Sequence, residues 1–225
     1  MIMMNPFLST ILLVLFVGGV LTLLHMNTNG FLNTTRRRVR RAQVCEWTLT
    51  QFLNLYNKPS SSKSFLFHEQ EVFSLGHRFN GRFDTAVLHW EEAPILDAII
   101  ERKFPTRHLP EKPKDEDIFQ AGLYALALME SGVSCSSARL VIVYCLQRKA
   151  KQCIGRNFND CAACGDGRVF SRRFSQKQVI RALAKLDEVW YKGRKPKARP
   201  DKRNCQTCPY GRSGTCNHSA AWAKE

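Results

Sequence analysis

The sequence predicts an α/β fold, and two observations carry this prediction. Apolar or alternating runs of strand length are followed by longer runs with helical spacing. Hydrophobic residues make up 44% of the 225 residues and charged residues 24%, a composition typical of a chain with a buried core. The formal net charge of +15 indicates a polyanionic partner, either nucleic acid or an acidic membrane surface.

The periodicity places the elements along the chain. Glycine and the Ser/Asn/Pro-rich segments mark the breaks between them. Strands are expected at residues 64–75 and 77–90 around a turn at Asn80–Gly81, then at 94–104 and 138–146. Helices are expected at residues 45–56, 118–132 and 175–193, the last with Ser175 as N-cap and Gly193 just beyond its end. Residues 147–174 are basic and cysteine-rich and predict an extended hairpin or insertion, and residues 194–204 a basic linker.

An uncharged apolar segment opens the chain. Pro6–Leu24 contains no charge and would span about 28 Å as a helix, close to the thickness of a bilayer core. No Lys or Arg precedes it and no small-residue cleavage site follows, which disfavours a signal peptide. The basic residues that follow predict a cytoplasmic C-terminal side; they are Arg36, Arg37, Arg38, Arg40 and Arg41. We therefore expect a single-pass membrane protein, with a transmembrane anchor at 1–26, a basic juxtamembrane linker at 27–44 and a folded domain at 45–225.

Two carboxylates and a lysine end neighbouring strands. Asp84 closes the segment Gly-Arg-Phe-Asp, while Glu101 and Lys103 stand at i and i+2 of the next strand and so share a face. Such carboxylates could share Mg²⁺ or Mn²⁺, with the backbone carbonyl of Arg102 as a further ligand. Lys103 would orient the attacking water in phosphodiester hydrolysis. A Glu-x-Lys pattern is common on solvated strands, but this strand is too apolar for a surface position.

A polar pair follows on the next predicted helix. Gln120 and Tyr124 are four residues apart and therefore lie on one helical face. They could position a substrate and the catalytic groups. The alternative is ordinary helix packing, with Tyr124 partly buried in the core.

Taken in order, these motifs resemble a known family. G-x-x-D, E-x-K and Q-x-x-x-Y follow one another as in RecB-like nucleases of the PD-(D/E)XK superfamily. An early cysteine and a late C-x-x-C-P-Y…C are similar to the iron–sulfur branch of that family, which includes CRISPR-associated exonucleases. These cysteines are Cys45, Cys205, Cys208 and Cys216, and the resemblance covers nearly the whole chain between the first and the last of them.

The resemblance implies a fold, an activity and a set of roles. The fold would be a restriction-endonuclease-like mixed sheet flanked by helices, with a C-terminal iron–sulfur region at residues 205–216. The activity would be a Mg²⁺- or Mn²⁺-dependent deoxyribonuclease, an exonuclease on single-stranded DNA ends in DNA repair or in CRISPR spacer acquisition and antiviral defence, alongside adaptation or repair proteins. The implied catalytic residues are Asp84, Glu101, Lys103, Gln120 and Tyr124, the metal ligands Asp84, Glu101 and Arg102, and the ligands of a 4Fe–4S cluster Cys45, Cys205, Cys208 and Cys216.

One departure from the family keeps a second function open. The family has a metal-binding histidine on a helix upstream of the G-x-x-D aspartate, but no histidine lies between Cys45 and Phe65. His68 falls on a predicted strand, close to Asp84. The alternative is a catalytically weakened DNA-binding or adaptation subunit that keeps the fold and the cluster. A third interpretation is a membrane redox or zinc module, but it does not explain why G-x-x-D, E-x-K and Q-x-x-x-Y follow one another in this order.

A second cysteine group leaves two readings open. Cys145, Cys153, Cys161 and Cys164 form C-x7-C-x7-C-x2-C. Four thiolates could close a zinc site. Alternatively, Cys145 is a buried strand residue and the others are unliganded thiols. The C-terminal cysteines could also form a local zinc knot, with this group or His218 supplying the missing ligand.

Overall fold

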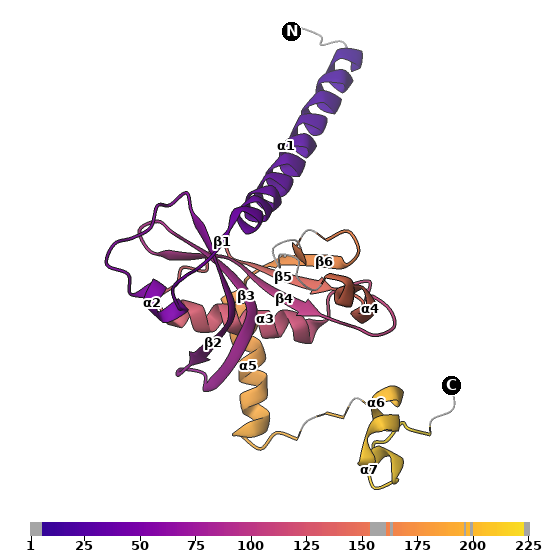
Figure 1. The fold of residues 1–225 in the computed structure, drawn as a ribbon. Helices are drawn as coiled ribbons and strands as arrows, with labels where there is room; N and C mark the ends of the chain where they lie inside the picture. Colours follow the sequence, from indigo (N-terminus) through magenta and orange to yellow (C-terminus); the bar gives the residue numbers. More distant parts are fainter. Residues whose placement is uncertain (1–5, 154–160, 163, 196, 199, 223–225) are drawn as a thin grey trace. The chain divides into compact units, whose positions relative to one another are not determined.

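The computed structural model describes residues 6–153, 161–162, 164–195, 197–198 and 200–222 (Figure 1). In the first helix, side chains are described for residues 11–22 and 35–41. The chain forms two compact units, residues 1–180 and 181–225, and each is described by itself.

A six-stranded mixed sheet forms the centre of the first unit. Its strands follow chain order, from β1 to β6. β2–β3, β3–β4 and β5–β6 are antiparallel pairs, whereas β1–β2 and β4–β5 are parallel. The strands are β1 (Gln43–Val44), β2 (Ser64–Ser74), β3 (Phe79–Trp90), β4 (Pro94–Lys103), β5 (Arg139–Tyr144) and β6 (Arg168–Arg173). The predicted α/β class with a mixed sheet is confirmed.

The helices Leu49–Leu53 and Gln176–Trp190 are shorter than the periodic patterns that predicted them, whereas the helix Asp115–Glu130 begins three residues before its pattern. α2 begins at a capping box, in which Thr48 and Gln51 exchange side-chain and backbone hydrogen bonds. α5 begins directly after Ser175, and Gly193 beyond its end has a left-handed φ of 69°. The helices of this part are α1 (Pro6–Arg41), α2 (Leu49–Leu53), α3 (Asp115–Glu130), α4 (Gln147–Ala150) and α5 (Gln176–Trp190).

Helices α1 and α3 cover opposite faces of the sheet. Val39 near the end of α1 packs in one cluster with Val141 of β5. On α3, Gly122 lies so near Leu140 of β5 that an added Cβ would stand 3.8 Å from its Cδ1. Because successive strand residues point to opposite faces, α1 and α3 lie on either side of β5. The parallel connection from β4 to β5 runs through α3, which is the usual crossover for a parallel pair.

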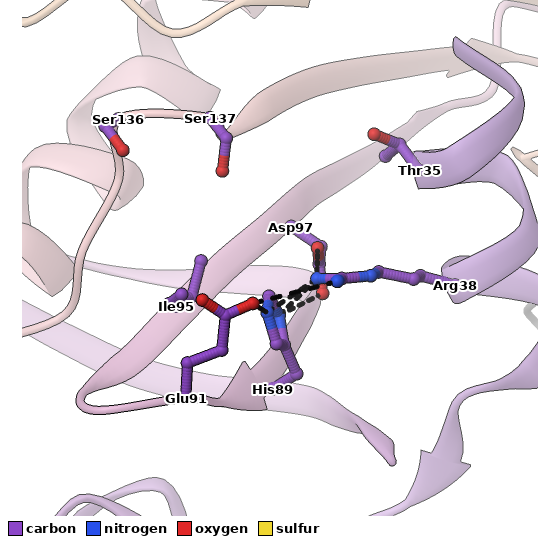
Figure 2. A pocket seen from close by; sticks show the side chains of 8 residues that line it. All are labelled: Thr35, Arg38, His89, Glu91, Ile95, Asp97, Ser136 and Ser137. Carbon is purple, nitrogen blue, oxygen red and sulfur yellow. Dashed lines mark hydrogen bonds and ion pairs between the residues drawn. The ribbon is translucent and has the colours of Figure 1, made fainter. Parts of the chain in front are cut away.

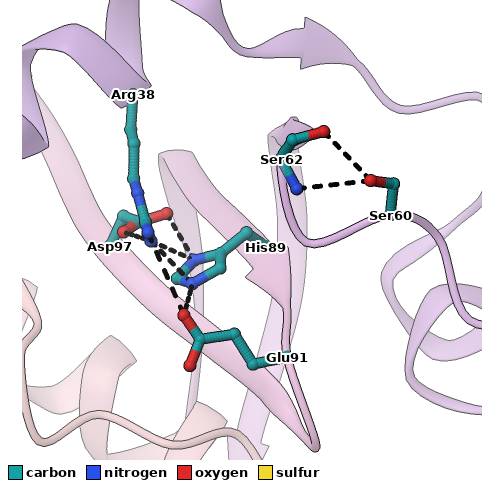
Figure 3. A network of polar contacts seen from close by, with 6 residues as sticks. All are labelled: Arg38, Ser60, Ser62, His89, Glu91 and Asp97. Atoms are coloured by element: carbon teal, nitrogen blue, oxygen red, sulfur yellow. Dashed lines mark hydrogen bonds and ion pairs between the residues drawn. The ribbon is translucent and has the colours of Figure 1, made fainter.

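A β-bulge turns a buried carboxylate toward α1. The β3–β4 register shifts so that Val87 pairs with Ala98 but Leu88 pairs with Leu96, which leaves Asp97 as the extra residue. Asp97 can therefore share the α1 face with its neighbour Ala98. There its carboxylate accepts a hydrogen bond from Arg38 at 2.8 Å (Figure 3). The bulge is thus the local feature that fixes the end of α1 to the sheet.

The predicted membrane anchor needs correction. Of the helices in the described residues, none combines the length and the apolar character that crossing a membrane requires. Helix α1 continues without a break into the arginine-rich residues that were expected to form a linker, and Val39 and Ala42 at that end are buried. The prediction of a transmembrane helix at residues 1–26, and with it the single-pass membrane localisation, is wrong.

The predicted turn at Asn80–Gly81 is also wrong. Both residues lie within β3, opposite Phe73 and Val72 of β2. The chain reverses at residues 75–78, where Arg78 takes a left-handed φ of 56°. The Asn-Gly pair is a strong turn signal, but here the glycine serves a packing contact described below.

Helix α5 runs on into the second unit, whose described residues also form two short helices around the C-terminal cysteines. α6 (Lys202–Thr207) is capped by Asp201, whose side chain accepts a hydrogen bond from Asn204 N at 3.0 Å. α7 (Pro209–Arg212) follows at once. A Cβ added to Gly211 would lie 2.5 Å from the carbonyl oxygen of Cys205, so the two helices touch along the backbone.

The ion network at the end of α1 generates a stability prediction. Replacing Arg38 by Ala should lower the free energy of unfolding by about 1–3 kcal/mol, because Asp97 stays buried after losing its cationic partner. The matched control is Arg36→Ala on the same helix, whose side chain is exposed; it should change stability by less than about 0.5 kcal/mol. Chemical denaturation of both variants measures the difference, and equal losses would contradict the anchoring role.

Candidate active site

Asp84 lies where the β2–β3 ladder is interrupted. The strand pairing skips from His68↔Thr85 to Gln70↔Phe83, and Glu69, opposite Asp84, takes a left-handed φ of 49°. Such backbone geometry in a non-glycine residue is uncommon and is concentrated at functional sites. Asp84 Oδ2 accepts a hydrogen bond from the backbone N of Arg102 at 2.7 Å. The aspartate is therefore held against the C-terminal end of β4.

Glu101 is a buried carboxylate on β4. Its side chain is 2% exposed, and Oε1 is buried with no hydrogen-bond partner in the described structure. Oε2 lies 3.4 Å from Lys103 Nζ. The pKa of Glu101 is raised to about 7, first by burial and then by the neighbouring charge of Asp84, while Lys103 opposes the rise. A carboxyl with one unsatisfied buried oxygen beside a second carboxylate suits a cation ligand.

Lys103 joins β4 to helix α3. Its ammonium donates a hydrogen bond to Gln120 Oε1 at 2.7 Å. Gln120 Nε2 in turn donates to the Tyr124 hydroxyl at 2.8 Å. The structure therefore brings together the residues predicted as the site, in one chain of contacts from Glu101 to Tyr124. Both local rules used for the prediction, i to i+2 on a strand and i to i+4 on a helix, are confirmed for these residues.

The close approach of Tyr124 to β3 requires a glycine at position 81. A Cβ at this position would stand 2.6 Å from Tyr124 Cε1, closer than any side-chain contact allows. The ring of Phe83 packs against Tyr124 with the ring centroids 6.4 Å apart. Tyr124 is thus 7% exposed, and burial raises the pKa of its hydroxyl, which stays protonated at neutral pH. The glycine makes room for the tyrosine that orients Gln120.

The structure adds two residues that sequence reasoning missed. Asp117 Oδ1 lies 3.7 Å from Lys103 Nζ, and Asp117 Oδ2 accepts a hydrogen bond from the Tyr144 hydroxyl. Burial, together with the hydrogen bond to Asp117, raises the pKa of Tyr144 to about 12. Asp117 precedes Gln120 by three residues and shares its helical face, which is the signal that could have found it. Tyr144 ends β5 and gave no such signal.

His68 lies beside the site on β2. Its Nδ1 is 3.1 Å from Thr85 Oγ1. Burial lowers the pKa of His68, and the positive charge of Arg102 lowers it further, so the imidazole is neutral at pH 7. A neutral imidazole can ligate a metal, but in this structure Thr85 takes up one ring nitrogen.

A separate polar cavity of about 330 Å³ lies toward the other end of the same strands. His89, Asp97 and Arg38 line it, together with Glu91 (Figure 2). His89 Nδ1 lies 2.8 Å from Asp97 Oδ2 and His89 Nε2 3.2 Å from Glu91 Oε1. Asp97 precedes Glu101 by four strand residues, about 13 Å. Because the Arg38 guanidinium already occupies the space between these acids, we interpret the cluster as the attachment of α1.

The cysteines predicted to hold an iron–sulfur cluster fall in both units. Cys45 lies in the first unit, where its N donates to Leu66 O at 2.9 Å, and Cys205, Cys208 and Cys216 lie in the second. Across the described residues, no three His, Cys, Asp or Glu side chains are arranged to hold a metal ion. The fold prediction is therefore corrected here as well, because the C-terminal region is two short helices without an assembled metal site. The cofactor itself is not tested by this and stays a prediction.

Comparison with known proteins adds no family assignment. No protein-family model matches the chain, and no curated protein matches it. The resemblance to RecB-like nucleases of the PD-(D/E)XK superfamily therefore stays a prediction that depends on the site geometry.

The contact between Gly81 and Tyr124 gives a packing prediction. Gly81→Ala should lower the free energy of unfolding by about 1–3 kcal/mol, because the added methyl group displaces the buried ring. In a Tyr124→Ala background the same change should cost less than about 0.5 kcal/mol, since the obstacle is gone. Thermal and chemical denaturation of the four members of this double-mutant cycle measure the coupling. Equal costs in both backgrounds would show that the glycine is needed for another reason.

The raised pKa of Glu101 gives a pH prediction. The folded protein holds this proton up to about pH 7, whereas in the unfolded chain it leaves near the ordinary value of 4.5. Stability should therefore fall as pH rises from about 4.5 through about 7, by on the order of 3 kcal/mol from this group. Glu101→Gln should remove that loss and be more stable than the wild type at about pH 8.

Denaturation with a chelator present, at about pH 5 and about pH 8, tests this behaviour. The matched control is Glu71→Gln, because the Glu71 side chain is 77% exposed and pairs with Arg82 at the surface. It should leave the pH dependence as in the wild type. A Glu101→Gln variant with the full wild-type pH dependence would contradict the assignment.

Proposed function

We propose that the protein is a metal-dependent deoxyribonuclease that hydrolyses phosphodiester bonds at single-stranded DNA ends. One observation carries the proposal. The carboxyl of Glu101 is buried, keeps one oxygen without a hydrogen-bond partner, and lies next to Asp84 and Lys103. A buried acid of this kind lowers the stability of the fold. A bound cation would give the free carboxylate oxygen a partner and so account for its burial.

The residues present fit Mg²⁺ or Mn²⁺. Asp84 and Glu101 supply carboxylate oxygens, and the backbone carbonyl of Arg102, whose N is hydrogen-bonded to Asp84, is the third candidate ligand. When bound, the metal would activate a water molecule and stabilise negative charge on the phosphate. Only two acidic side chains contribute, so the remaining positions would be filled by water and by the DNA phosphate, as is usual for Mg²⁺.

The chain's own residues supply the second half of the chemistry. The Lys103 ammonium is held between Glu101 and Gln120 and would orient the attacking water and offset charge that develops on the phosphate. Gln120 is fixed by Tyr124, so the direction of the ammonium depends on a buried contact with Gly81. Asp117 adds negative charge beside Lys103, with its Oδ1 3.7 Å from Nζ, and so helps to hold the ammonium in place.

The charge and aromatic content of the second unit support a single-stranded partner. Its exposed aromatic side chains are Trp190, Tyr191, Tyr210 and Trp222. Basic residues are interspersed among them in the sequence, including Arg194, Lys195, Lys197, Lys202 and Arg203. Stacking of bases on aromatic rings, with phosphates drawn to basic side chains, is how proteins bind single strands without sequence preference.

A nuclease assay with the full chain tests the proposal. Labelled single-stranded DNA should be degraded in Mn²⁺ or Mg²⁺, and closed circular strands should resist if ends are required. Asp84→Asn, Glu101→Gln and Lys103→Ala should each lower the rate by about 100-fold or more, because each removes a contact to the metal or the reacting phosphate. Glu71→Gln, at an exposed position of β2, should retain full activity.

Two results would contradict the proposal. Equal degradation by the wild type and by Asp84→Asn would show that the activity belongs to another site or to a contaminant. DNA binding without cleavage, across both metals and both strand types, would favour the DNA-binding subunit without turnover.

A further inference from the structure

The second cysteine group lies at one end of the β5–β6 strand pair. Cys145 directly follows β5, and its backbone N donates to Lys103 O at 3.0 Å. Cys161 and Cys164 precede β6, whose first residue pairs with Tyr144. Gly167 lies against this junction, where an added Cβ would stand 2.7 Å from Tyr144 O and 3.9 Å from Cys145 Cα. Both ends of the intervening segment therefore meet at Cys145.

The remaining cysteines lie in short local turns on either side of the segment between β5 and β6. Cys164 N donates to Cys161 O at 3.2 Å, which closes the C-x-x-C into a tight turn. Helix α4 begins directly after Cys145 and Leu146 and passes into a short 3-10 helix that ends at Cys153. All four thiols are partly buried. Cys161 also packs beside the core cluster that contains Val143, so the turn is seated on the sheet.

Two of the cysteine positions are tied to this end of the strand pair by packing. Gly167, three residues after Cys164, lies beside Cys145, and Cys161 packs on the cluster that contains Val143. Thiolates that lie near one another repel, and a cation bound between them relieves that repulsion. As described, no three of these groups yet stand at metal-binding positions. Binding would have to draw the sulfurs together, to about 2.3 Å from a central ion.

We propose that Cys145, Cys153, Cys161 and Cys164 form a structural zinc site at the base of the β5–β6 pair. Four thiolates, two of them in a C-x-x-C turn, are the ligand set of closed tetrahedral zinc sites. The site is separate from the carboxylates of the proposed nuclease centre. It would fix the segment between β5 and β6 and, through Cys145 N and Lys103 O, support the end of β4. Its role is to stabilise the fold, since four protein ligands leave no position for a substrate.

Metal analysis of the full-length protein tests this site. Protein purified without chelators should contain stoichiometric zinc, and Cys161→Ser combined with Cys164→Ser should lose one equivalent per chain. Replacement of zinc by cobalt should give the intense visible absorption of a tetrahedral thiolate site, which the same double variant should lack. Cys153→His should keep the metal with an altered cobalt spectrum, because imidazole is also a zinc ligand.

Three controls separate the outcomes. Cys135→Ala should retain all zinc, because Cys135 is buried elsewhere and its thiol donates to Ala125 O at 3.4 Å. Cys205→Ser with Cys208→Ser separates this site from any metal at the C-terminal cysteines. Asp84→Asn should lose nuclease activity and keep zinc, so failure of the nuclease proposal does not affect this one. Zinc content unchanged in Cys161→Ser/Cys164→Ser, no zinc in the wild type, or iron and sulfide in its place would overturn the assignment.

Discussion

The burial of Glu101 is the constraint around which the first unit is arranged. A carboxylate that is 2% exposed loses its hydration, which disfavours the charged form. Lys103 stabilises the charged form only in part, so the pKa of Glu101 is still raised to about 7. The fold tolerates this loss of stability because Glu101 lies on β4, a strand inside the sheet that is paired with β3 on one side and β5 on the other. Asp84 and Lys103 reach it from the adjoining strand and from the same strand, so the cluster is positioned by backbone pairing rather than by a loop.

Helix α3 converts this strand cluster into an oriented site. The contacts pass from Lys103 to Gln120 and then to Tyr124, whose ring occupies the space that Gly81 leaves open. Each of these hydrogen bonds restricts the rotation of a long side chain, and together they fix the orientation of the Lys103 ammonium. The same helix brings Asp117 to within 3.7 Å of Lys103, so one helical face supplies two partners of the lysine, Asp117 and Gln120. The geometry therefore depends on β3 and α3 packing closely at a glycine.

The sequence predicted these residues well because they obey short-range rules. Glu101 and Lys103 share a strand face, Gln120 and Tyr124 share a helix face, and the apolar strand that carries Glu101 was recognisable as buried. The errors came where contacts over long distances decide the outcome. Asn80–Gly81 has the sequence of a turn, but the close approach of Tyr124 requires that glycine inside a strand. Tyr144, which donates a hydrogen bond to Asp117, could not be found because no nearby residue in the sequence indicates that its hydroxyl has a polar partner.

The misassigned anchor follows from the same limit. An uncharged run followed by arginines is what a membrane anchor and its flank look like, but the sequence alone does not show the buried acid that one arginine meets. Arg38 is matched to Asp97 by a bulge in β4, a register detail that periodicity cannot reveal. Strand β4 therefore carries one acid toward α1 and another, four residues on, toward α3. The first is neutralised by an arginine and holds a helix, whereas the second keeps an unsatisfied oxygen, and this difference in partners separates a structural ion pair from a site suited to chemistry.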